Sequence, residues 1–144
     1  MKKLSILILF LFITTCKNEK PEIIAPGTVP CEFCAMHITD MKFHTQIISA
    51  HGKHFHFDSI ECALDWKKNH EEESVHLWTT DFTKKNMIKM NEAYYLHSAK
   101  RQSPMKSGYS AYATKEEVET AKSHWEGKVL TFTELVSQHR SGNE

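Results

Sequence analysis

The alternation of apolar and polar side chains along the first half of the chain predicts two strands, a helix and a third strand. The tight-turn signal His51-Gly52 joins the two strands, and the second strand alternates cleanly between phenylalanine and histidine. Asp58 and Glu61 have the spacing of a capping box, which predicts that Asp58 is the N-cap of the helix. The four elements are expected at residues 43–50, 53–57, 60–69 and 75–80.

The second half of the chain repeats this order of elements, with little identity of side chains. Thr114 and Glu117 form another capping box, and Gly127 is placed to end the helix that they begin. Strands are expected at 93–98, 109–113 and 129–132, and a further short helix at 133–139. The pattern predicts an α+β fold of two ββαβ units, at about 37–82 and 90–140, which pack together because each is too small to be stable alone.

The N-terminus has the pattern of a bacterial secretory signal. Lys2 and Lys3 precede an almost purely apolar run from Leu4 to Ile13. That run is about half of the roughly 20 residues that a membrane-spanning helix needs. We therefore expect a cleaved signal peptide over residues 1–15. The small residues before Cys16 resemble a lipobox, so Cys16 is expected to become the lipidated first residue of the mature chain.

The segment that follows is expected to be a tether between a membrane anchor and a folded domain. Residues 16–30 contain Pro21, Pro26 and Pro30 among charged side chains and have no apolar period. Proline-rich linkers are extended and semi-rigid. The folded domain is accordingly expected over residues 31–144.

Composition excludes one class of partner and leaves the cysteines to be explained. The chain has 18 basic and 18 acidic residues, so it lacks the basic footprint of a nucleic-acid-binding protein. Beyond Cys16 the cysteines are Cys31, Cys34 and Cys62, an odd number that leaves at least one thiol outside any disulfide. The sequence contains neither a phosphate-binding glycine loop nor a nucleophile motif.

Three sulfur side chains lie within six residues, since Met36 follows Cys31 and Cys34 and is itself followed by His37. Thiolates and thioethers favour Cu(I) and other soft metals. A disulfide between the first two cysteines, a zinc site that adds Cys62, and a thiol-dependent redox or lyase enzyme remain open as alternatives. Met36 favours the soft metal, because none of the other interpretations uses it. Cys62 is expected to be a small buried side chain of the first helix.

Several short blocks, in the same order along the chain, resemble the NosL family, the lipoprotein copper chaperones for nitrous oxide reductase. Cys31 to Met36 resembles the family's CxxCGM signature, and Phe57-Asp58 followed by Cys62 resembles its next block. Ser103-Pro104-Met105 and Gly127-Lys128-Val129 resemble later blocks. Ala35 and Lys106 stand where the family usually has glycine.

The resemblance implies two packed ββαβ units, related to the fold of organomercurial lyase. It also implies a protein without enzymatic activity that binds Cu(I) outside the cytoplasm, held by a lipid anchor in the cell envelope and facing the periplasm or the cell surface. The implied partners are a copper enzyme, nitrous oxide reductase, and its membrane maturation machinery. Carried over by position, Cys34, Met36 and Met105 are the expected metal ligands, with Cys31 and His37 as further candidates.

Overall fold

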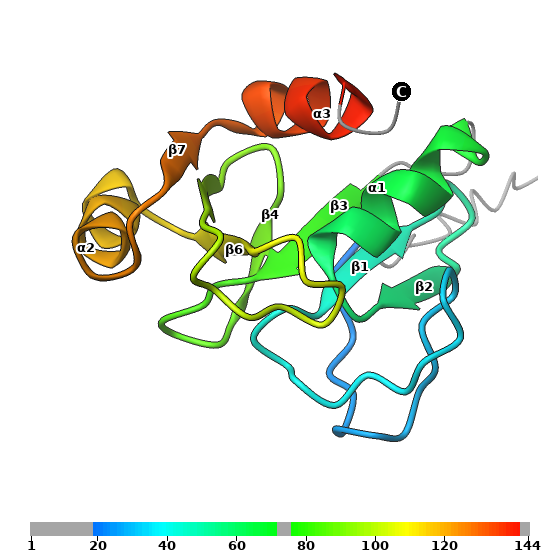
Figure 1. Cartoon of the computed structure of the whole chain (residues 1–144). Coiled ribbons are helices and arrows are strands. Elements are labelled where there is room, and N and C mark those ends of the chain that lie inside the picture. Colours follow the sequence, from blue (N-terminus) through cyan, green and yellow to red (C-terminus); the bar gives the residue numbers. More distant parts are fainter. Residues whose placement is uncertain (1–18, 72–75, 142–144) are drawn as a thin grey trace, which may run out of the picture.

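The computed structural model describes residues 19–71 and 76–141, so the expected signal peptide and Cys16 lie outside the described residues (Figure 1). Its elements, in chain order, are β1 (Thr45–Ile48), β2 (His54–Phe57), α1 (Ile60–Lys68), β3 (His76–Thr80), β4 (Met87–Lys89), β5 (Tyr94–His97), β6 (Tyr109–Tyr112), α2 (Lys115–Trp125), β7 (Lys128–Leu130) and α3 (Phe132–Ser141).

The strands form two antiparallel sheets with the same internal arrangement, which confirms the two predicted ββαβ units. The strand order is β2-β1-β3-β4 in the first sheet and β6-β5-β7 in the second. In each unit the first strand is central and the other two pair with its opposite edges. Strand β4, at the edge of the first sheet, was not predicted, because three residues are too few to display an alternation.

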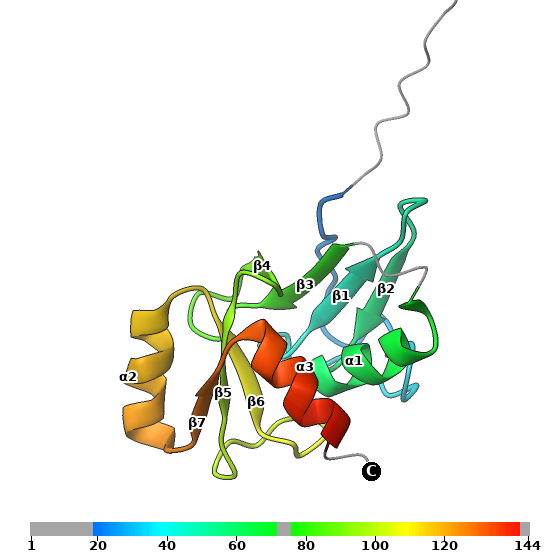
Figure 2. The same ribbon diagram turned by 90° about the horizontal axis from the view of Figure 1, so that it is seen from above.

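Figure 2 shows the two sheets next to each other, with α2 at one end of the molecule and α3 between α2 and α1. A buried apolar core joins the two units, and Ile88 of β4 packs against it. The buried residues of this core come from α1, β5, β6, β7 and α3, and include Ile60, Leu64, Tyr95, Ala111, Leu130 and Leu135. The helix α3, predicted at 133–139, packs against α1, β5 and β7. The shared core therefore fixes the second unit against the first turn of α1.

Helices α1 and α2 begin at a side-chain cap, although α1 is capped by a different residue from the one predicted. Ser59 is the N-cap of α1, because its hydroxyl accepts a hydrogen bond from the backbone N–H of Cys62. The prediction that Asp58 is the N-cap was wrong by one residue. The carboxylate of Asp58 takes no part in the cap. Thr114 is confirmed as the N-cap of α2. That helix ends at Trp125, its C-cap is Glu126 and not the predicted Gly127, and Glu126 and Gly127 both have positive φ angles.

Part of the predicted tether belongs to the folded domain. The backbone N–H of Glu22 donates to the side-chain oxygen of Gln46 at 2.9 Å, and the amide nitrogen of Gln46 donates back to the carbonyl of Glu22 at 3.3 Å. The N–H of Gly27 donates to the carbonyl of Ile38 at 2.7 Å. These hydrogen bonds join residues 22–27 to the domain that was predicted over residues 31–144. Within residues 19–71 and 76–141, no helix combines the length and apolar character needed to cross a membrane.

Two glycines with the same φ angle of +77° differ in what surrounds them. A Cβ atom on Gly108 would overlap the backbone oxygen of Ser98, whereas no described atom lies within 4 Å of one on Gly27. Gly27→Ala is therefore expected to lower the free energy of unfolding by about 1–2 kcal/mol, from the φ angle alone. Gly108→Ala is expected to lower it by more than about 3 kcal/mol, because the backbone at Ser98 must also move.

Equilibrium unfolding in urea measures both losses. Equal losses in the two variants would show that Gly108 does not need its close approach to Ser98.

Candidate metal centre

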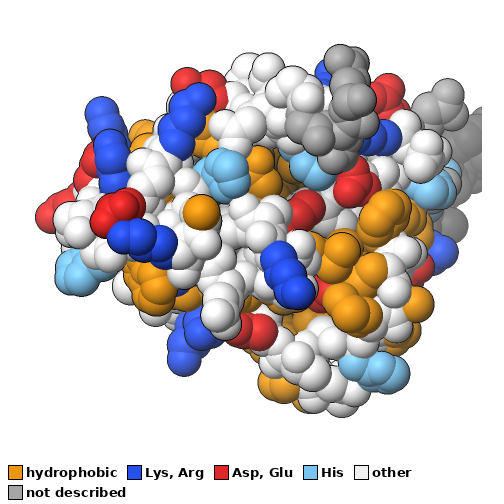
Figure 3. Space-filling model, in the orientation of Figure 1, with side chains coloured by type: hydrophobic (Ala, Val, Ile, Leu, Met, Phe, Trp, Pro, Cys, Tyr) orange, Lys and Arg blue, Asp and Glu red, His pale blue; other side chains and the backbone are white. Residues whose placement is uncertain are grey.

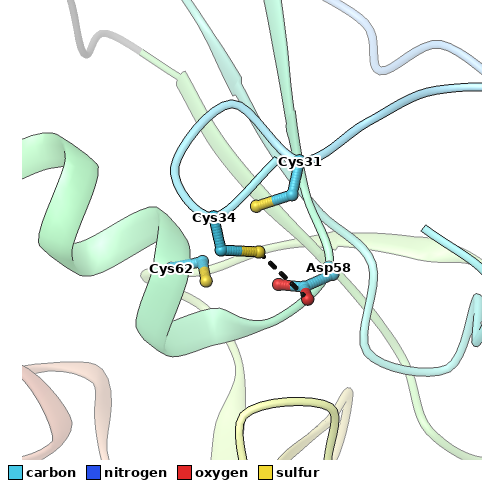
Figure 4. A group of neighbouring side chains, drawn as sticks. All are labelled: Cys31, Cys34, Asp58 and Cys62. Atoms are coloured by element: carbon cyan, nitrogen blue, oxygen red, sulfur yellow. Dashed lines mark hydrogen bonds between the residues drawn. The ribbon is translucent and has the colours of Figure 1, made fainter. Parts of the chain in front are cut away.

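Four side chains from three places in the sequence converge beside the first turn of α1. Cys31 and Cys34 lie in the loop before β1, Asp58 directly follows β2, and Cys62 is in the first turn of α1. One ligand atom from each, a sulfur or a carboxylate oxygen, lies within 4.8 Å of all the others. Figure 4 shows the four side chains pointing toward one another. We call this set the thiol cluster.

Backbone hydrogen bonds hold the loop that carries the first two cysteines. The N–H of Cys31 donates to the carbonyl of Met36 at 2.8 Å, and the N–H of Ala35 donates back to the carbonyl of Cys31 at 2.9 Å. Ala35 has a φ of 62°, so it keeps the left-handed backbone that glycine would adopt with less strain. A further bond from the N–H of Glu32 to the carbonyl of His56 ties this loop to β2.

The other two members of the cluster are positioned by the start of α1. Asp58 and Cys62 are 3% and 1% exposed, and the Ser59 cap between them fixes the direction in which the helix leaves the strand. The Asp58 carboxylate accepts a hydrogen bond from the thiol of Cys34 at 3.5 Å. Its other oxygen, Oδ1, is buried and has no hydrogen-bond partner among the described residues. A buried oxygen without a partner can interact favourably with a cation.

The three thiols are free and differ in their affinity for protons. A hydrogen bond from the thiol of Cys62 lowers the pKa of Cys31 to about 6. Burial raises the pKa of Cys34 to about 11. The pKa of Cys62 is also raised, mainly because its thiol donates a hydrogen bond to the Cys31 sulfur. A metal bound by these sulfurs would displace the protons of the thiols, because the thiolate is the ligand form.

The size and chemistry of the thiol cluster suit one soft or borderline metal ion. A metal–sulfur bond is about 2.3 Å, so sulfurs on opposite sides of one ion lie about 4.6 Å apart. That separation is close to the 4.8 Å limit of the cluster. Three sulfur donors match Cu(I), whereas three thiolates with a carboxylate also match zinc.

The residues expected as ligands from the sequence occupy different places around this cluster. Cys31 and Cys34 are members of it. Met36 is 46% exposed, and its backbone N–H donates to the Cys34 sulfur, which places its backbone next to the cluster. His37 is exposed and pairs with Pro30 through the backbone, and the structure does not bring it into the cluster.

Met105 reaches the first unit from the second, as the predicted repeat allows. It is 39% exposed and lines an open pocket of about 330 Å³ together with Glu61 and Cys62. Lys106 has a φ of 61°, so the loop keeps a left-handed residue without glycine, as at Ala35. Met105 therefore borders the pocket on the Cys62 side of the cluster.

Sequence analysis did not identify Asp58 as a member of the site, and considered Cys62 as a ligand only in the zinc alternative. Asp58 was assigned to the helix cap and Cys62 to the core, since each is a common residue in those roles. The available signal was their spacing, which places both at the junction of a strand and a helix.

Apolar side chains are exposed near the thiol cluster. Phe33 and Met36, from the loop that carries the cysteines, are each 46% exposed. Figure 3 shows hydrophobic side chains gathered at the surface on the side of the molecule where β2 lies. A partner that approached the cluster from this side would meet apolar surface.

The fold matches a solved structure, described as the crystal structure of the copper chaperone NosL from Shewanella denitrificans, with a TM-score of 0.69. The two chains are 16% identical, and the match covers 81% of this chain and 95% of the other. No curated protein matches the chain. The model of the NosL family matches residues 25–139, which confirms the resemblance found in the sequence blocks. This match extends over both ββαβ units and the thiol cluster, and the chain therefore belongs to the NosL family.

Proposed function

We propose that this chain is an extracytoplasmic metallochaperone that binds Cu(I) and delivers it for the assembly of nitrous oxide reductase, as a carrier and not an enzyme. The observation that carries the proposal is the place of Cys34 in a cluster of three thiols and a carboxylate within 4.8 Å, beside a pocket that Cys62 and Met105 line. Membership of the NosL family, and a fold shared with a protein described as a copper chaperone, support the same function.

A mixed set of sulfur ligands suits a protein that must both hold and release copper. In the proposed site Cys34 supplies a thiolate, and Met36 and Met105 supply thioethers from the two sides of the cluster. The thiolate gives charge and a strong bond, and the thioethers add soft contacts that exchange readily. Because the two methionines are exposed, a ligand from an acceptor protein can replace them one at a time.

A structural zinc site is the second candidate, because three cysteines and an aspartate are also a zinc donor set. Met36 and Met105 have no part in such a site, since thioethers are poor zinc ligands. The two candidates thus differ in whether methionine matters. Metal analysis of protein purified anaerobically in the reduced state separates them, because bound zinc without uptake of copper would favour the structural site.

Cys34→Ser is expected to abolish tight binding of one Cu(I) per chain, because it removes the proposed thiolate. Met36→Leu keeps the size of the side chain and removes the thioether, and is expected to weaken binding by about tenfold or more. Competition with a chromophoric Cu(I) chelator under anaerobic conditions measures both affinities.

The matched control is Met87→Leu, which makes the same change on β4, outside the proposed site, and should leave the affinity for Cu(I) unchanged. If Cys34→Ser and Met36→Leu together left that affinity intact, the ligand assignment would be wrong.

We further propose that Cys16 anchors the chain to a membrane and that copper passes to nitrous oxide reductase with its membrane maturation machinery. The secretory pattern and the residues before Cys16 support an anchor, and the acceptor is the one that the resemblance of the sequence blocks implies. An anchor would hold the carrier near partners at the same membrane.

Cys16→Ser is expected to move the chain out of the membrane fraction, and to lower the copper content of nitrous oxide reductase made in the same cells. A Cys16→Ser chain that stayed in the membrane fraction would contradict the lipid anchor. Unchanged copper in the enzyme, with the carrier chain deleted, would contradict the delivery.

A further inference from the structure

Glu61 is a buried acidic residue directly before Cys62, and it connects the two units. Its side chain is 6% exposed. Its Oε1 atom accepts hydrogen bonds from the hydroxyls of Ser103, at 3.4 Å, and Ser107. Both serines belong to the loop between β5 and β6, drawn in yellow in Figure 1, which passes beside the first turn of α1. This loop carries Met105.

An ordinary helix-end role does not explain the burial of Glu61. Acidic side chains in the first turn stabilise a helix through its dipole, and they do so while exposed to solvent. The equivalent position in the second unit shows this, because Glu116 follows the Thr114 cap of α2 at the same distance and is exposed. Burying a carboxylate is costly unless hydrogen bonds compensate. In α1 the two serine hydroxyls supply part of that compensation at Oε1, while Oε2 is buried without a hydrogen-bond partner among the described residues.

Hydrogen bonds within the loop that Glu61 contacts hold its residues together. The hydroxyl of Ser103 also accepts a hydrogen bond from the N–H of Gly108 at 3.0 Å, and the N–H of Lys106 donates to the carbonyl of Ser103 at 2.9 Å. Met105 lies between the two serines that bind Glu61. Fixing both serines therefore limits where the sulfur of Met105 can lie.

Glu61 and Met105 meet at the pocket next to the thiol cluster. Glu61, Cys62, Met105 and Ser107 all line it. We propose that Glu61 is a positioning residue that holds Met105 of the second unit beside the thiol cluster of the first. It brings the thioether within reach of a metal bound by Cys34. This inference rests on the proposed function, because it assigns Met105 a metal to bind.

A double-mutant cycle on the purified full chain tests the inference. Cu(I) affinity is measured for the wild type, Glu61→Ala, Met105→Leu and the double variant. Each single substitution is expected to weaken binding by about 10–100-fold, the usual cost of losing a supporting contact to a metal site. The double variant is expected to bind no more weakly than Met105→Leu, because Glu61 acts through that methionine.

Two further variants separate positioning from general destabilisation. Glu61→Gln keeps a side-chain oxygen that accepts the serine hydroxyls, and is expected to restore most of the affinity. Glu116→Ala removes the matching acidic residue of α2 and is expected to change nothing. X-ray absorption of the copper-loaded Glu61→Ala chain should show the loss of a sulfur neighbour, as in Met105→Leu.

The outcomes distinguish this inference from the proposed function. If Met105→Leu weakens binding and Glu61→Ala does not, or if their losses add in the double variant, Glu61 is not a positioning residue. If the wild type itself takes up no Cu(I), the proposed function fails first. Should Glu61→Ala not fold, as judged by circular dichroism, the same cycle is run with Ser107→Ala, where additive losses would again overturn the inference.

Discussion

The junction between β2 and α1 is the constraint on which the site depends. Within five consecutive residues it supplies the helix cap and three side chains with different partners: Asp58, Ser59, Glu61 and Cys62. Ser59 fixes the first turn by accepting the backbone N–H of Cys62. With the turn fixed, one carboxylate faces Cys34 and the other faces the loop of Met105. A change at this junction would alter both sides of the pocket.

The two units share an architecture and differ in chemistry. Both have a central first strand, a capped helix after the second strand, and an acidic residue two positions after the cap. In the second unit that residue, Glu116, faces solvent, and no cysteine lies in the helix. The first unit provides the thiol cluster, and the second provides the loop with Met105. The repeat therefore places a second element against the first helix without repeating the site.

The element order could be predicted from the sequence because it depends on local patterns, and the packing of the two units followed from their small size. Alternation marks the longer strands, and capping boxes mark the starts of α1 and α2 to within a residue. The short strand β4 gave no such pattern. The membership of Asp58 in the site could not be predicted, and that of Cys62 stayed one of two alternatives, since both depend on how the cysteine loop folds back onto α1. The packing of residues 22–30 could not be predicted either, because proline and charged residues are typical of both linkers and surface segments.

Copper held between a thiolate and two thioethers is the central claim of this account. X-ray absorption at the copper edge, on Cu(I)-loaded protein in which selenomethionine replaces methionine, tests it most directly because selenium and sulfur neighbours are distinguishable. The account predicts selenium from Met36 and Met105 bound to the copper, together with sulfur from Cys34. A copper bound by sulfur without any selenium neighbour would contradict it, and would assign the metal to the cysteines alone.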